Sequence, residues 1–71
     1  MTVEEVVFEI LREDKSFGMS ADELCNSVQE KFPNREPGGV RAETIDALNQ
    51  GLAIGTIIEA PNQRGFYCWN Q

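Results

Sequence analysis

The sequence predicts an α+β domain in which three helices are followed by a C-terminal β-hairpin. Two segments begin with a capping box and continue with apolar residues at helical spacing, and a third apolar stripe ends at a glycine. The C-terminal segment then changes to a β-branched run and an aromatic run, separated by turn residues. A chain of 71 residues is short, so we expect one domain over residues 1–71.

The first helix is predicted over residues 2–14. Thr2 with Glu5 three residues later forms a capping box at its start. Phe8 lies beside the apolar stripe and is expected to widen it toward a neighbouring element. The stripe consists of Val3, Val6, Val7, Ile10 and Leu11. The acidic residues that lie off the stripe are Glu4, Glu5, Glu9, Glu13 and Asp14.

A second helix is predicted to begin at the capping box 20–23 and to run to about Phe32, where Pro33 ends it. Before it, residues 16–19 are predicted to form a short connection or a strand of a single bridge. After it, residues 33–39 are rich in turn formers and are predicted to be a loop. The buried face of this helix is predicted to contain Ala21, Leu24, Cys25, Val28 and Phe32.

The third helix is predicted over residues 41–53, with Gly55 as its C-terminal cap. Ile45, Leu48 and Leu52 form the predicted buried stripe. Gly51 weakens a helix by about 1 kcal/mol relative to Ala, so we expect a local requirement for a small residue there. The opposite, exposed face is predicted to hold Glu43, Asp46, Ala47 and Gln50.

The predicted hairpin joins strands 56–60 and 66–69 through the turn residues 61–65. Side chains alternate between the two faces of a strand. Phe66 and Cys68 therefore face the core while Tyr67 and Trp69 face outward, or the arrangement is reversed.

The composition argues against an enzyme or a metalloprotein. The chain has no His, which removes the commonest general base and most zinc sites. Cys25 and Cys68 have apolar neighbours, and we expect them to be reduced, buried thiols. No glycine motif for binding phosphate is present. We therefore expect no catalytic residues, no cofactor, no metal and no small-molecule substrate.

The charge is distributed unevenly. The formal net charge is −6, of which residues 1–14 contribute −4, residues 15–31 contribute −1 and residues 32–71 contribute −1. No apolar run is long enough to span a membrane, and the first residues are acidic rather than basic as in a secretory signal. We expect an intracellular protein, cytoplasmic or nuclear.

Segments 44–48 (TIDAL) and 55–58 (GTII), with Leu52 between them, resemble the passage from recognition helix to wing in the winged helix-turn-helix superfamily. Segment 64–67 (RGFY) resembles the far side of the wing. This resemblance implies DNA binding and transcription regulation, with the third helix in the major groove and the hairpin on the backbone or in the minor groove.

On this hypothesis Arg35, Arg41 and Arg64 contact phosphates, and Thr44 and Gln50 complete the predicted nucleic-acid-binding set. The acidic residues on the exposed face of the third helix oppose such binding, because they repel phosphates. Since the cations are few, we expect a monomer to bind DNA weakly and a dimer or larger assembly to supply affinity.

The alternative is a protein-binding module, for docking or for homodimer formation. Its predicted interface contains Glu5 and Glu9 of the first helix and Tyr67 and Trp69 of the hairpin. In a sharper form, the acidic residues of the first helix mimic DNA and inhibit a nucleic-acid-binding partner. Clustering of the three arginines would favour DNA, and a contiguous acidic face with Tyr67 or Trp69 exposed would favour a protein partner.

Overall fold

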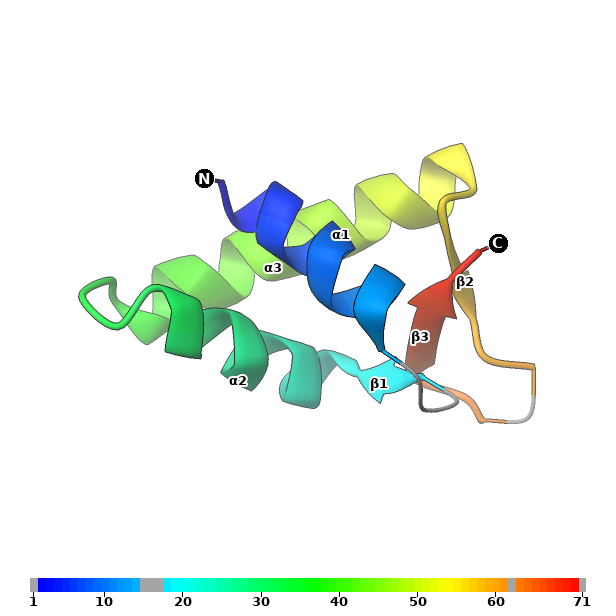
Figure 1. Ribbon diagram of the computed structural model, residues 1–71, viewed down its shortest axis with the longest axis horizontal. Coiled ribbons are helices and arrows are strands. Elements are labelled where there is room, and N and C mark those ends of the chain that lie inside the picture. Colours follow the sequence, from blue (N-terminus) through cyan, green and yellow to red (C-terminus); the bar gives the residue numbers. More distant parts are fainter. Residues whose placement is uncertain (1, 15–17, 62, 71) are drawn as a thin grey trace.

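The computed structural model describes residues 2–14, 18–61 and 63–70, and it confirms the α+β prediction (Figure 1). Three helices precede two C-terminal strands, and a further short strand lies between the first two helices. Of the predicted connection 16–19, residues 16 and 17 lie outside the described residues, and Met19 belongs to that short strand. The elements in chain order are α1 (Val3–Glu13), β1 (Met19–Ser20), α2 (Ala21–Lys31), α3 (Pro37–Ile54), β2 (Ile57–Glu59) and β3 (Phe66–Trp69).

The N-cap hydrogen bond of each predicted capping box is present, at the N-termini of α1 and α2. The backbone N–H of Glu5 donates to Thr2 Oγ1 at 3.1 Å, and that of Glu23 donates to Ser20 Oγ at 3.2 Å. Each hydroxyl satisfies an N–H that has no partner within its own helix. The next residue after α2 is Phe32, its C-cap, and Pro33 follows as predicted.

The start of α3 corrects the sequence prediction. The helix begins at Pro37, four residues before the predicted start, with Glu36 as the N-cap. Proline suits the first helical position because its φ is already helical and its missing N–H would have no partner there. Gly38 and Gly39, predicted to lie in a loop, therefore belong to the first turn of α3. Gly55 ends the helix with a φ of 87°, as predicted.

The buried face of α3 also differs from the prediction. Of the predicted stripe, Leu48 is buried, Leu52 is half-buried against the core and Ile45 is half-buried at the side. Ala47, predicted to be exposed, is only 3% exposed. The buried residues of α3 are Val40, Thr44, Ala47, Leu48 and Gly51. Small residues of α3 lie where other elements approach closely. A prediction based only on large apolar residues therefore places the buried face of α3 incorrectly.

Gly51 is small because Ile57 packs directly on it. A Cβ atom built on Gly51 would lie 2.3 Å from Ile57 Cδ1 and 2.7 Å from Ile57 Cγ1. Ile57 is the first residue of β2 and is 1% exposed. The contact therefore joins the last turns of α3 to the sheet, and it confirms the expected local need for a small residue.

The strands form an antiparallel sheet in the order β1-β3-β2. Buried Ile57 pairs with Trp69, so Trp69 and, two residues earlier, Tyr67 lie on the face toward the helices. Both pack against the core. The second of the two predicted arrangements is thus the observed one, and Cys68 shares the outer face with its partner Ile58.

The core lies between α1, α2 and α3, and the sheet closes one end of it (Figure 1). The loop between α2 and α3 lies at the other end of the molecule. Within the described residues, no helix combines the length and apolar character needed to cross a membrane. The buried apolar side chains of the core cluster are Val3, Val6, Val7, Leu11, Leu24, Val28, Val40, Ala47, Leu48 and Ile57.

Candidate interaction surfaces

Two of the three predicted phosphate-binding arginines are held by carboxylates. Arg41 Nη2 lies 2.9 Å from Asp22 Oδ1, which joins the start of α3 to the first turn of α2. The same carboxylate raises the pKa of Arg41 above its usual value. Arg35 pairs with Glu43, and its guanidinium carbon lies 5.8 Å from the centre of the Phe32 ring. A phosphate at either arginine would meet the paired carboxylate as well.

Arg64 is separate from this pair of arginines. It is exposed in the connection between β2 and β3, and no ion pair forms on it among the described residues. This connection lies at the sheet end of the molecule, whereas the loop before α3 lies at the opposite end (Figure 1). Arg35 and Arg64 therefore belong to opposite ends of the fold, and the predicted phosphate contacts are dispersed.

The remaining predicted nucleic-acid contacts differ in accessibility. Thr44 is 1% exposed, and its hydroxyl donates to the carbonyl of Val40 at 2.7 Å. This side chain therefore belongs to the core and is not on the exposed face that the predicted DNA contact requires. Gln50 is exposed, but the exposed residues of α3 also include the acidic Glu43 and Asp46.

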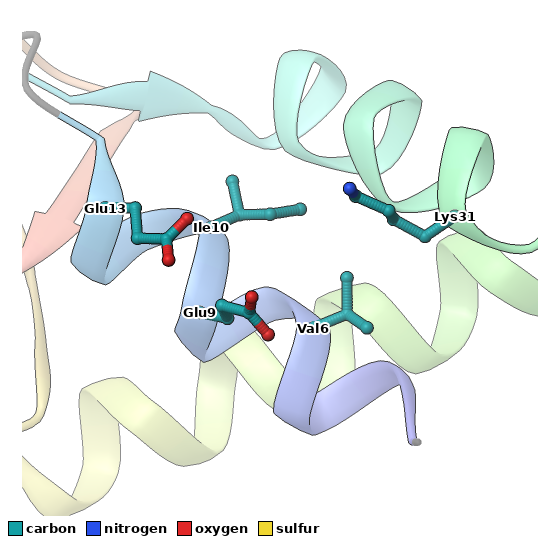
Figure 2. A pocket seen from close by; sticks show the side chains of 5 residues that line it. All are labelled: Val6, Glu9, Ile10, Glu13 and Lys31. Carbon is teal, nitrogen blue, oxygen red and sulfur yellow. The ribbon is translucent and has the colours of Figure 1, made fainter.

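A groove of about 170 Å³ runs between α1 and α2. Its lining combines the aliphatic Val6 and Ile10, the carboxylates Glu9 and Glu13, and Lys31 from the last turn of α2. Figure 2 shows Val6 and Ile10 pointing from α1 toward α2, and Lys31 reaching back toward them. Val6 is buried and Ile10 half-buried, so the groove has an aliphatic floor.

The charged groups of this groove are free of ion pairs among the described residues. Among residues 2–14, 18–61 and 63–70, neither Glu9 nor Glu13 has a cation within salt-bridge distance, and Lys31 has no carboxylate within that distance. The two glutamates lie four residues apart, hence on the same side of α1 one turn from each other. Glu5, the other predicted acidic interface residue, is exposed but serves the N-terminal capping box of α1.

The opposite side of α1 is covered by the sheet. The rings of Phe8 and Trp69 meet edge to face with their centroids 5.7 Å apart, which confirms that Phe8 extends the apolar stripe toward a neighbour. Arg12 lies over Trp69, with its guanidinium carbon 6.0 Å from the ring centre. The predicted interface aromatics Tyr67 and Trp69 are half-buried against the core, and the exposed large apolar side chains in the described part of the chain are Ile54 and Ile58.

The cysteines are free thiols. Cys25 is buried, and burial raises the pKa of its thiol, with a smaller opposing effect from the nearby Arg41. Cys25 is therefore protonated at neutral pH and is a poor nucleophile. Cys68 is half-buried on the outer face of the sheet. No three Cys, Asp or Glu side chains among the described residues are placed to hold a metal ion.

The sequence predicted the acidic side of α1 but missed the groove next to it. Glu9 and Glu13 are recognisable from their spacing, and Val6 and Ile10 lie beside them on the helical wheel. The position of Lys31 in the groove could not be predicted from the sequence. Lys31 belongs to α2, and only the packing of the two helices brings it close to α1.

Comparisons with protein-family models, with curated proteins and with solved structures give no match for this chain.

Proposed function

We propose that this chain is a winged-helix-type domain that binds another protein through the groove between α1 and α2. The element order α1-β1-α2-α3-β2-β3 and the sheet order β1-β3-β2 support the resemblance to winged helix-turn-helix domains, with the β2–β3 connection as the wing. A fold of this kind does not determine function, so the choice of partner depends on the surfaces.

The observation that carries this proposal is the contrast between free carboxylates and occupied arginines. Glu9 and Glu13 flank an aliphatic floor and form no salt bridge within the described part of the chain, whereas Arg35 and Arg41 already have carboxylate partners. An apolar floor with charged rims is the usual composition of a protein-binding surface. Nucleic acid requires the reverse, namely available cations and few carboxylates.

DNA binding is the second candidate, and one observation favours it. Arg64 is exposed in the β2–β3 connection without an ion pair among the described residues. A free arginine in a wing can contact phosphates or enter a narrow minor groove. The remaining contacts on α3 would depend on Gln50 beside acidic neighbours.

The two candidates can be separated with a photo-cross-linking amino acid placed at position 13 or at position 50. Extract of the native cells is illuminated with each variant, and the adducts are digested with protease or nuclease. We expect position 13 to give protease-sensitive adducts that disappear when Ile10→Asp disrupts the groove floor, with folding checked by circular dichroism. Nuclease-sensitive adducts at position 50, without adducts at position 13, would contradict the protein-binding function.

The DNA candidate has a direct test. Labelled duplex DNA is titrated with the protein, and anisotropy is followed at about 50 mM and about 200 mM salt, because phosphate contacts weaken steeply over this range. We expect no binding below about 10⁻⁴ M protein, which is the weak end of the ordinary range of non-specific dissociation constants. Salt-sensitive binding that is lost in Arg64→Ala would instead establish the second candidate.

A further inference from the structure

The lining residues of the groove between α1 and α2 repeat at the spacing of one helical turn, which suits contact with a second helix. Val6 and Ile10 lie one helical turn apart on its floor, and Glu9 and Glu13 repeat the same spacing on the α1 wall. One turn of an α-helix rises about 5.4 Å. A second helix packed along α1 presents its own side chains at this spacing, so each floor residue and each carboxylate can meet one partner residue.

The charged side chains of α1 indicate that the partner carries positive charge. The α1 wall carries two carboxylates with no cation in salt-bridge range among the described residues, and the first 14 residues sum to −4. A second copy of the chain would bring the same acidic helix to this wall, and nucleic acid would bring phosphates; both are repelled. A basic partner gains attraction here without first breaking an existing ion pair.

Lys31 restricts where the partner carries its cations. It projects into the groove from the α2 side and meets no carboxylate of the described chain (Figure 2). A partner cation on that side would be repelled, whereas one beside Glu9 or Glu13 would be attracted. The groove therefore fits a helix whose basic edge faces α1 and whose aliphatic edge faces the floor.

We infer that the groove binds an amphipathic helix of a partner protein that has aliphatic residues on one face and two Lys or Arg residues four positions apart beside it. The aliphatic residues pack on the half-buried Ile10, above the buried Val6, and the two cations pair with Glu9 and Glu13. This inference rests on the proposed protein-binding function and adds the chemistry and the secondary structure of the partner.

The test uses phage-displayed helical peptides as the probe. In the library, one helical face varies between Leu and Ser, and the positions flanking it vary between Lys and Glu. Selection is carried out on the wild-type protein, and the selected peptides are then titrated against two variants with equal changes in net charge. Glu9→Gln with Glu13→Gln removes the groove carboxylates, and the control, Glu36→Gln with Asp46→Asn, removes exposed carboxylates at the start of α3 and on it.

We expect selected peptides to carry Leu on the varied face and Lys at flanking positions four residues apart. Their affinity should fall about fivefold to tenfold for Glu9→Gln with Glu13→Gln, as expected for two half-exposed ion pairs, and stay within about twofold for the control. Circular dichroism should show that both variants remain folded.

Selection of Glu-flanked peptides, equal weakening by both variants, or no enrichment at all would overturn the inference. The cross-linking result at position 13 keeps the two proposals distinguishable. Groove-dependent protein adducts together with a failed peptide selection would leave the protein-binding function intact and reject a basic helix as its partner. If neither the protein adducts at position 13 nor the peptide enrichment were observed, the proposed protein-binding function would be rejected.

Discussion

The charges of α1 and those at the start of α3 are available to a partner to different degrees. On α1, Glu9 and Glu13 lie beside an aliphatic groove, and neither forms a salt bridge with a cation among the described residues. Around the start of α3, Arg35 and Arg41 are each joined to a carboxylate of the same molecule. The formal charge of a segment therefore does not indicate how much of that charge can bind a partner; the neighbours in the fold decide it.

The packing of these two helices differs in a related way. The buried face of α1 consists of Val and Leu residues, and its position was predicted correctly. The buried face of α3 includes Thr44, Ala47 and Gly51, whose small size permits close approach of α1, α2 and β2. The buried face of a helix that packs through large apolar residues can be predicted from their spacing in the sequence. The buried face of a helix that packs through small residues cannot be recognised in this way.

The largest effect that can test the corrected face of α3 comes from truncating its buried leucine. Leu48 is 4% exposed, so Leu48→Ala should lower the free energy of unfolding by about 2–5 kcal/mol through lost burial and a residual cavity. Ile45→Ala, at the side of the helix, should cost about 1 kcal/mol or less. Urea denaturation of both variants measures the difference. If Ile45→Ala lowered the free energy of unfolding more than Leu48→Ala, the buried face of α3 would be the one predicted from the sequence.

An intermediate effect is expected at the contact between α3 and β2. Gly51→Ala places a Cβ where Ile57 now packs, and overpacking of about 1–3 kcal/mol should outweigh a gain of about 1 kcal/mol in helix propensity. The net loss measured by chemical denaturation should be at most about 2 kcal/mol. Adding Ile57→Val should recover part of it, so the double variant should be more stable than the sum of the single effects predicts. Strict additivity would show that the steric contact is not the cause.

The smallest effect on stability is expected when the arginines near α3 lose their carboxylate partners. The same change should have a clear effect on DNA binding. Asp22→Asn with Glu43→Gln removes both carboxylate partners, and the thermal midpoint should change little because exposed ion pairs contribute little to stability. Weak DNA binding should appear at about 50 mM salt and disappear at about 200 mM.

The matched control for this experiment is Glu9→Gln with Glu13→Gln, which changes the net charge equally but leaves the arginines paired. Equal DNA binding by both double variants would mean that net charge alone governs the interaction. The pairing of Arg35 and Arg41 with carboxylates would then not be what limits DNA binding.

Several parts of the fold were predictable because their signals are local. The two capping boxes, the stop at Pro33 and the left-handed cap at Gly55 each depend on a few neighbouring residues. Pro37 and the glycines after it were assigned to a loop, because the turn tendency of these residues conceals the suitability of proline for a first helical position. For the candidate site, the acidic side of α1 was predictable and its groove was not.

The sequence by itself determined the order of the helices and hairpin strands, the ends marked by caps and the concentration of acid on α1, because these follow from residues close together in the chain. Only the tertiary structure decided which face of α3 is buried, that Thr44 belongs to the core, that Tyr67 and Trp69 face the helices, and that Arg35 and Arg41 each pair with a carboxylate. These properties depend on contacts between elements, such as Asp22 with Arg41 or Gly51 with Ile57, whose partners become neighbours only when the helices and the sheet pack together.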